Sequence, residues 1–281
     1  MPEGIAIERG GWRTLLKWHR GRKQAGDIAF TGARIAEGLS LGASVEIDLQ
    51  RQAGGGFVVL HDQTLERETT GIGAVADALP DYLERLRLRD NDGNSTEHVP
   101  MLLGDLARLL AEKSGGDGAI LQLDMKNDAI DLTNGDVKVF AETMAPVLDH
   151  IILSCGDAAL VKMMRDALPK LGVGYDPCHF GAVDAVLASS KFARFVVDAV
   201  AAMPHATMIY LEARLVLEAD RRGFNLVEAF HNNGKTIDAY TIRDSNVSML
   251  PDVLRLLDLR CDQITTDDPI GLERLVMTAT A

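Results

Sequence analysis

Residues 45–62 are VEIDLQRQAGGGFVVLHD, and this stretch constrains the fold more than any other. Two apolar runs of strand length, Val45–Leu49 and Phe57–Leu60, stand on either side of Gly54-Gly55-Gly56. The link Gln50–Gly56 is too short for the helical crossover that joins parallel neighbours. Either the two runs form a local hairpin, or one predicted strand of this chain is false, and the sequence leaves both open.

Outside this stretch, short apolar runs alternate with longer amphipathic segments along most of the chain. Met101–Leu110 and Val253–Leu259 have the i, i+3, i+4 spacing of helices. Repeated strand-then-helix order predicts a parallel sheet with helices outside it. The nine predicted strands, one more than an eight-stranded barrel needs, are Leu15–Trp18, Val45–Leu49, Phe57–Leu60, Ala119–Met125, Ile151–Ser154, Val173–Tyr175, Met208–Leu211, Thr236–Thr241 and Gln263–Thr265.

The length and the local composition favour a single domain. A chain of 281 residues fits one α/β barrel, which often needs about 250 residues. The most polar segment, Arg85–His98, interrupts the strand–helix rhythm after the third predicted strand. It is too short to form a second folded domain. We therefore expect one domain over residues 1–281, with a short polar insertion at about 85–98.

Charge and cysteine content exclude several classes of function. The formal net charge of −12 argues against nucleic acid as a partner, because phosphate backbones bind basic surfaces. The three cysteines (Cys155, Cys178, Cys261) are far apart, which disfavours a zinc–thiolate site or a disulfide framework. We find no secretion signal and no apolar stretch of about 18 residues. We expect a cytoplasmic protein without stable membrane association; the oligomeric state stays open.

Glu46 and Asp48 are the first candidates for a functional site. Residues i and i+2 of a strand point to the same face, so the two carboxylates share one side of Val45–Leu49. Two carboxylates that point together into a protein repel unless a cation joins them, and oxygen ligands suit Mg²⁺ or Ca²⁺. The alternative is that this strand has one solvated face.

Three further groups lie at the ends of predicted strands, where parallel barrels build their active sites. His19 stands beside Arg20, so a proton-transfer group adjoins a fixed cation that can hold a phosphoryl oxygen. His61 supplies a second proton-transfer group. Asp124 and Lys126 repeat the i, i+2 spacing, which also fits a structural ion pair. Nucleotide-binding P-loop and dinucleotide motifs, and the G-x-S-x-G elbow of serine hydrolases, are absent from the sequence.

In this order the clusters resemble the glycerophosphodiester phosphodiesterase family, and the similarity spans His19 to Pro269, nearly the whole chain. Tyr240 stands where the family usually has Trp. The matching segments are His19-Arg20-Gly21, Gly42–Asp48 (GASVEID), Val58–Gly73 (VVLHDQTLERETTGIG), Val99–Leu102 (VPML), Asp124-Met125-Lys126 and Thr266-Asp267-Asp268-Pro269.

The resemblance implies a (β/α)8 barrel that hydrolyses a phosphodiester to a phosphomonoester and an alcohol. One divalent cation, which could be Mg²⁺, Ca²⁺ or Mn²⁺, would be bound by Glu46, Asp48 and Asp124. Asp124 stands where the family usually has Glu. His19 and His61 would be the acid/base pair. The phosphate would be held by Arg20 and Lys126. The substrate would be a small molecule, a glycerophosphodiester or a related sugar-phosphate diester.

One departure from the family bears on the substrate. The family's P-E-N-T element falls at Ile28–Thr31, where Ala29 replaces the Glu. Ala29 opens space, so we expect a bulkier alcohol than glycerophosphodiesters usually carry, unless Gln24 or Glu37 does the work of the missing Glu. Two other functions remain open: a sphingomyelinase D-like phospholipase, and a catalytically inactive barrel that binds a phosphorylated ligand.

Overall fold

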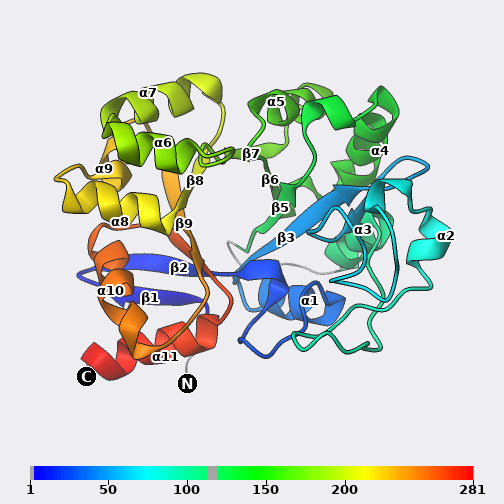
Figure 1. Ribbon diagram of the computed structural model, residues 1–281, viewed down its shortest axis with the longest axis horizontal. Helices are drawn as coiled ribbons and strands as arrows, with labels where there is room; N and C mark the ends of the chain where they lie inside the picture. The colour runs from blue at the N-terminus through cyan, green and yellow to red at the C-terminus, as the bar shows by residue number, and fades with distance from the viewer. Residues whose placement is uncertain (1–2, 113–118, 281) are drawn as a thin grey trace.

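The computed structural model describes residues 3–112 and 119–280 of the chain. Eight of its strands form a closed parallel barrel, in which each strand pairs with the next along the chain and the last pairs with the first (Figure 1). In chain order these strands are β2 (Trp12–Trp18), β3 (Ser44–Arg51), β5 (Leu121–Met125), β6 (Ile151–Ser154), β7 (Gly172–Tyr175), β8 (Met208–Glu212), β9 (Thr236–Ile242) and β10 (Gln263–Thr266).

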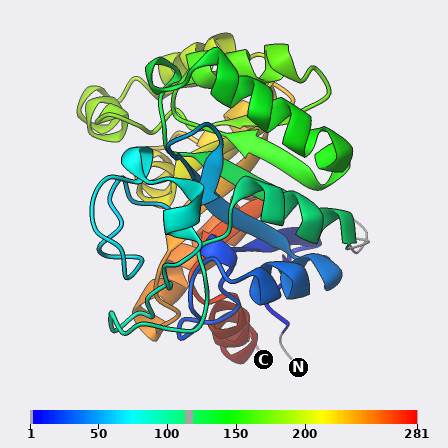
Figure 2. The ribbon, with the colours of Figure 1, turned by 90° about the vertical axis from the view of Figure 1, so that its right-hand side faces the viewer.

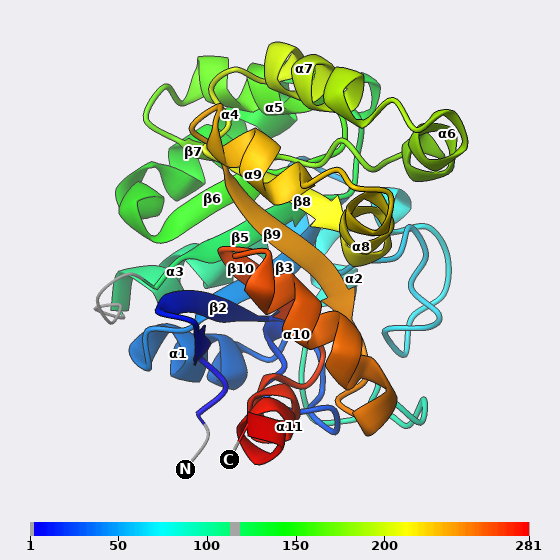
Figure 3. The same ribbon diagram turned by 90° about the vertical axis from the view of Figure 1, so that its left-hand side faces the viewer.

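Helices cover the outside of the barrel, and the fold is the predicted (β/α)8 barrel (Figures 1 and 3). Both helices expected from apolar spacing are present, as α3 (Leu103–Glu112) and α10 (Leu250–Asp258). The other helices are α1 (Gly32–Ser40), α2 (Pro80–Leu83), α4 (Asn134–Met144), α5 (Ala158–Ala167), α6 (Ala182–Ser189), α7 (Phe192–Ala202), α8 (Ala213–Arg221), α9 (Leu226–His231) and α11 (Pro269–Thr280).

The stretch at 45–62 forms a hairpin, which accounts for the ninth predicted strand. β4 (Phe57–Val59) pairs antiparallel with β3, with Arg51 opposite Phe57. Gly54, Gly55 and Gly56 all have φ between +84° and +107°, a backbone region that glycine adopts far more readily than other residues. β4 is therefore outside the barrel, and all nine predicted strands exist.

The first strand, β1 (Ala6–Arg9), was not predicted. It pairs antiparallel with β2 and lies beside α11, at the other end of the chain (Figure 3). The Gly4 amide donates to the Glu273 carboxylate at 2.7 Å, so the two ends of the described chain are bonded to each other.

The interior of the barrel is polar below its mouth. Lys17 on β2 and Asp238 on β9 form an ion pair of 2.5 Å, and both side chains are almost fully buried. Lys17 also donates to Gln122 and lies over the Tyr210 ring, with Nζ 4.5 Å from its centroid. This layer keeps hydrophilic side chains beneath the place where the strands end.

The polar segment at residues 85–98 lies outside the described helices and strands, between α2 and α3 (Figure 2). It folds back on itself, because the Leu88 amide donates to the His98 carbonyl at 2.7 Å. Asn91 extends to the segment between β2 and α1 and donates to the Ala25 carbonyl at 2.9 Å. None of the described helices has the length and apolar character that a membrane span requires.

Candidate active site

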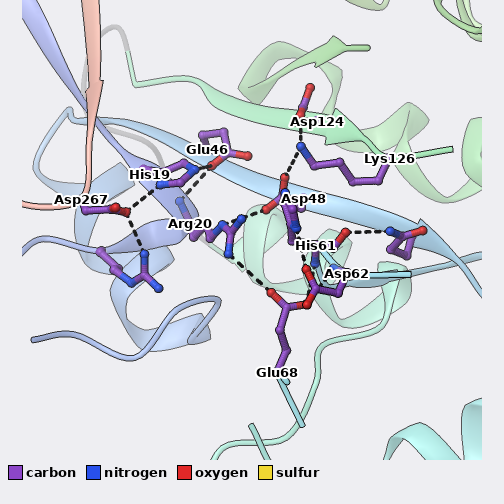
Figure 4. Close-up of polar contacts among 12 residues, drawn as sticks. His19, Arg20, Glu46, Asp48, His61, Asp62, Glu68, Asp124, Lys126 and Asp267 are labelled. Atoms are coloured by element: carbon purple, nitrogen blue, oxygen red, sulfur yellow. Dashed lines mark hydrogen bonds and ion pairs between the residues drawn. The ribbon is translucent and has the colours of Figure 1, made fainter. Parts of the chain in front are cut away.

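Neighbouring strands bring the three predicted metal ligands together. β3 pairs in parallel with β5 in a register that places Asp48 beside Asp124, and Glu46 precedes Asp48 on the same face. One carboxylate oxygen from each of the three lies within 4.8 Å of the others (Figure 4). The spacing of Glu46 and Asp48 therefore predicted a real cluster, and Asp124 belongs to it.

Basic side chains partly neutralise this cluster. Lys126 Nζ lies 2.8 Å from Asp48 and 2.5 Å from Asp124, and Arg20 Nε lies 3.3 Å from Asp48. Burial alone would raise the pKa of Asp48, but the charges of Lys126 and Arg20 outweigh it and hold that pKa well below its usual range. Asp48 is therefore an anion at neutral pH.

The pKa of Glu46 shifts in the opposite direction to that of Asp48. Burial, followed by the charge of Asp48, raises its pKa well above the usual value for a carboxyl group. Both oxygens of Asp48 are buried, and apart from the ion pairs with Lys126 and Arg20 they have no hydrogen-bond partner in the described chain. Three converging carboxylates, one of them destabilised as an anion and one with cations as its only polar partners, fit a hard divalent cation.

His19 lies directly after β2, in a short 3-10 turn over His19–Gly21. Its Nδ1 is 2.6 Å from Asp267, which follows β10, and its Nε2 is 3.9 Å from Glu46. Burial lowers the pKa of His19, and the contact with Asp267 opposes that effect without cancelling it. The imidazole is thus neutral near pH 7, with Nδ1 fixed by a carboxylate and Nε2 directed toward the cluster.

His61 follows β4 and has the same kind of support. Its Nδ1 is 2.8 Å from Asp62, which in turn pairs with Arg67. The His61 and Asp62 amides both donate to the Glu68 carboxylate at 2.9 Å. Glu68 therefore holds the turn that carries the second imidazole.

A cavity of about 220 Å³ lies over the barrel mouth, and six of the seven predicted site residues line it. Asp48 is just beneath, in contact with Arg20 and Lys126. Since Asp48 contacts two of the lining residues, all seven lie together in one site. The lining residues predicted from the sequence are His19, Arg20, Glu46, His61, Asp124 and Lys126.

The opposite wall contains residues that the sequence analysis missed. His179 Nε2 is 3.2 Å from Asp176, which raises the pKa of the imidazole despite its partial burial. The Tyr240 hydroxyl donates to Asp176 at 2.7 Å. A Cβ at Gly156 would lie 2.0 Å from the His179 ring, so any other residue at this position would displace the ring. The D-x-x-H spacing of Asp176 and His179 after a predicted strand was the available signal.

Ala29 lines a second cavity, beside Arg20, instead of the first. Neither residue suggested as a replacement for the missing Glu contacts Arg20: Glu37 pairs with Lys23 and Arg34, and Gln24 bonds Asp27. Besides Asp48, the carboxylate that lies near the Arg20 guanidinium is that of Glu68, whose Oε1 is 3.5 Å from Arg20 Nη1. Glu68 comes from the turn after β4, so position in the sequence did not reveal it.

Comparison with protein families gives one match over most of the chain. The model of the "Glycerophosphoryl diester phosphodiesterase family" matches residues 19–270, from the first catalytic candidate to the start of α11. No curated protein sequence matches this chain.

Solved structures of this kind have the same fold at low sequence identity. A glycerophosphoryl diester phosphodiesterase from Parabacteroides distasonis is 20% identical, with a TM-score of 0.68, over 98% of this chain and 90% of that one. A glycerophosphodiester phosphodiesterase from Agrobacterium tumefaciens is 18% identical (TM-score 0.66; 93% and 99% covered). An Oleispira antarctica phosphodiesterase in complex with its product sn-glycerol-3-phosphate is 16% identical (TM-score 0.62; 93% and 96% covered).

Proposed function

We propose that His19 and His61 act as the acid–base pair of this chain, which belongs to the glycerophosphoryl diester phosphodiesterase family and is a phosphoric diester hydrolase. The substrate would be a glycerophosphodiester or a related sugar-phosphate diester. The products would be a phosphomonoester and an alcohol. The family match supports the reaction class, and the site geometry supports the roles of the two histidines as acid and base.

The observation that carries the proposal is the matched support of the two imidazoles. Each has a carboxylate on Nδ1, Asp267 for His19 and Asp62 for His61, and both line the same cavity. A carboxylate on Nδ1 fixes the tautomer and leaves Nε2 to move a proton. Because burial lowers its pKa, neutral His19 is suited to accept the proton of the nucleophile. His61 would then protonate the leaving alkoxide.

The remaining residues hold the phosphate and a cation. Arg20 and Lys126 would bind phosphoryl oxygens, since both line the cavity between the imidazoles. Glu46, Asp48 and Asp124 would hold one divalent cation, Mg²⁺, Ca²⁺ or Mn²⁺. When bound, the cation supplies positive charge that stabilises the negative charge developing on the phosphoryl group.

The test is turnover by single-residue variants. With a panel of glycerophosphodiesters, whose leaving alkoxides need a proton, His19→Ala and His61→Ala should each lower kcat by about 10² to 10⁴-fold, as loss of a general acid or base does. His205→Ala is the matched control, because His205 is exposed between α7 and β8. Near-wild-type turnover by both site variants would rule out the acid–base assignment. Binding without turnover by the wild-type protein would favour an inactive barrel.

A further inference from the structure

A second cavity of about 220 Å³ adjoins the barrel mouth. Three segments build it: the connection from β2 to α1, the turn after β4, and the polar segment at residues 85–98. Arg20 lines both cavities, so they meet at the guanidinium proposed to hold the phosphate. A phosphodiester bound at Arg20 can therefore direct one of its alcohols into the second cavity.

Arginines outnumber carboxylates in the lining of this cavity, four to two. Three of the four are paired with carboxylates outside the lining: Arg20 with Asp48, Arg22 with Asp267 and Arg67 with Asp62. An arginine without such an ion pair attracts anions. The charged lining residues are Arg20, Arg22, Arg67, Arg89, Glu68 and Asp90.

Arg89 is the arginine best placed to bind a ligand. Its Nε donates to the carbonyls of Glu66 and Thr69, at 3.1 and 2.7 Å, and its Nη1 donates to the Gly93 carbonyl at 2.7 Å. These bonds fix the side chain without neutralising it, because carbonyl oxygens carry no net charge. In the described chain no carboxylate oxygen lies within 4.0 Å of its nitrogens, and Nη2 has no hydrogen-bond partner.

Arg22 faces the cavity from the other side. Its Nη1 donates to Asp267 at 2.7 Å, and its Nε is buried without a hydrogen-bond partner in the described chain. Ala29 lines the same cavity, and its side chain ends at Cβ. A longer side chain at position 29 would project into the cavity, and an acidic one would offset its positive charge.

We infer that this cavity is a subsite for a second anionic group, a carboxylate or a phosphate, on the alcohol of the phosphodiester substrate. The inference rests on the proposed function and narrows it to one class of diester. Arg89 and Arg22 bind the anionic group, Arg20 bridges it to the scissile phosphate, and Ala29 provides the room. The polar segment at residues 85–98 is then a specificity element.

The first experiment compares pairs of diesters that differ by one anionic group. Glycerophosphoserine has one carboxylate more than glycerophosphoethanolamine, and glycerophosphoinositol 4-phosphate has one phosphate more than glycerophosphoinositol. In at least one pair the more anionic diester should have a kcat/KM about tenfold higher or more, as expected for a charge-assisted contact. The pair that responds identifies carboxylate or phosphate. Ratios near one in both pairs overturn the subsite.

The second experiment tests charge at constant size. Ala29→Glu and Ala29→Gln introduce side chains of the same shape that differ by one negative charge. The preference for the more anionic diester should fall about tenfold further in Ala29→Glu than in Ala29→Gln. Equal effects would show that the cavity selects by size, and would contradict the inference. Arg89→Gln should also reduce the preference, whereas Arg85→Gln, at an exposed site of the same segment outside the cavity, should leave it unchanged.

Failure of the proposed function would have a different signature. If no diester is hydrolysed, the reaction assignment fails, and the same pairs measured as ligands by calorimetry still test the cavity. The more anionic diester must then bind about tenfold more tightly to wild-type protein than its partner. Equal affinities would overturn the subsite independently of catalysis.

Discussion

Glu68 illustrates how much a single buried carboxylate can organise. It accepts the amides of His61 and Asp62 at 2.9 Å and lies 3.5 Å from the guanidinium of Arg20. It thus connects the turn that carries one proposed catalytic imidazole to the arginine proposed to bind phosphate. Glu68 touches none of the reacting atoms in this scheme, so its role is to position the others.

Glu68→Gln should lower kcat/KM by about 10 to 100-fold, because a hydrogen bond to a charged group contributes about 1.5–3 kcal/mol. A purely structural role would lower the melting temperature and leave the kinetics of the folded fraction unchanged. Kinetics at a temperature where the variant is fully folded separate the two. Glu66→Gln is the matched control: its carboxylate accepts the Gly73 amide in the same turn, but is exposed. Equal kinetics for the two variants would contradict this role for Glu68.

The pair of His19 and Asp267 predicts a pH profile. Burial lowers the pKa of His19, so the neutral form of the imidazole persists below the ordinary histidine value of about 6.5. If His19 is the base, kcat/KM should therefore begin to decline on the acid side (the acid limb of the profile) only at a pH below that value. Asp267→Asn removes a contact that raises the His19 pKa, so the limb should move to still lower pH.

The same variant should also lower kcat by about 10²-fold or more, because the asparagine no longer fixes the tautomer. Asp262→Asn provides the comparison, since Asp262 contacts His231 at 2.8 Å outside the barrel mouth. It should change neither the limb nor kcat. An acid limb that stays in place in Asp267→Asn would assign the titration to another group.

At the scale of elements, strand register creates the metal site. Asp48 on β3 lies beside Asp124 on β5 in the parallel ladder, and Glu46 lies two residues before Asp48. If one of these strands slipped by one residue, its carboxylates would point away from the cavity, because side chains alternate between the two faces of a strand. Two rigid strands therefore position all three carboxylates.

Metal removal should abolish turnover, and Mg²⁺, Mn²⁺ or Ca²⁺ should restore it. The cation should also raise the melting temperature of chelator-treated protein, because a ligand that binds only the folded state stabilises it. Glu46→Gln and Asp48→Asn should remove that thermal shift and raise the metal concentration needed for activity. Asp105→Asn, on the outer helix α3, should leave both measurements unchanged. Full activity in metal-free protein would exclude the cation from the mechanism.

Local pattern predicted most elements of this fold, but not their pairing. All nine predicted runs are strands, because short apolar runs bounded by turn signals are typical of strands. Whether β4 belongs to the barrel depends on which strand it pairs with, and local sequence does not determine strand pairing. The only local indication of a hairpin was the short glycine link before β4. β1 was missed because Ala6–Arg9 has only two apolar residues, which are followed by two charged ones.

The same limit applied to the site. Residues within motifs, such as His19 and Glu46, could be chosen from the sequence because their neighbours were informative. Asp176 and His179 offered only a D-x-x-H spacing after a strand, and the tertiary structure brings them to the cavity. Glu68 sits inside a motif that suggested its neighbour His61, yet its contact with Arg20 spans 48 positions of chain and depends on the closed barrel.

At the scale of the whole molecule, the bond between Gly4 and Glu273 has a consequence for chain connectivity. In a closed barrel every strand has two neighbours, so the order of strands is cyclic and the position of the chain ends is arbitrary. A circular permutant, with a short linker joining the two ends and new termini at the exposed pair Ser190–Lys191 between α6 and α7, should therefore keep the fold. Because no residue of α6, α7 or their link lines the proposed active site, its kcat/KM should stay within about tenfold of the parent. A permutant that folds, as judged by circular dichroism, but does not turn over would show that this region of the chain matters for catalysis.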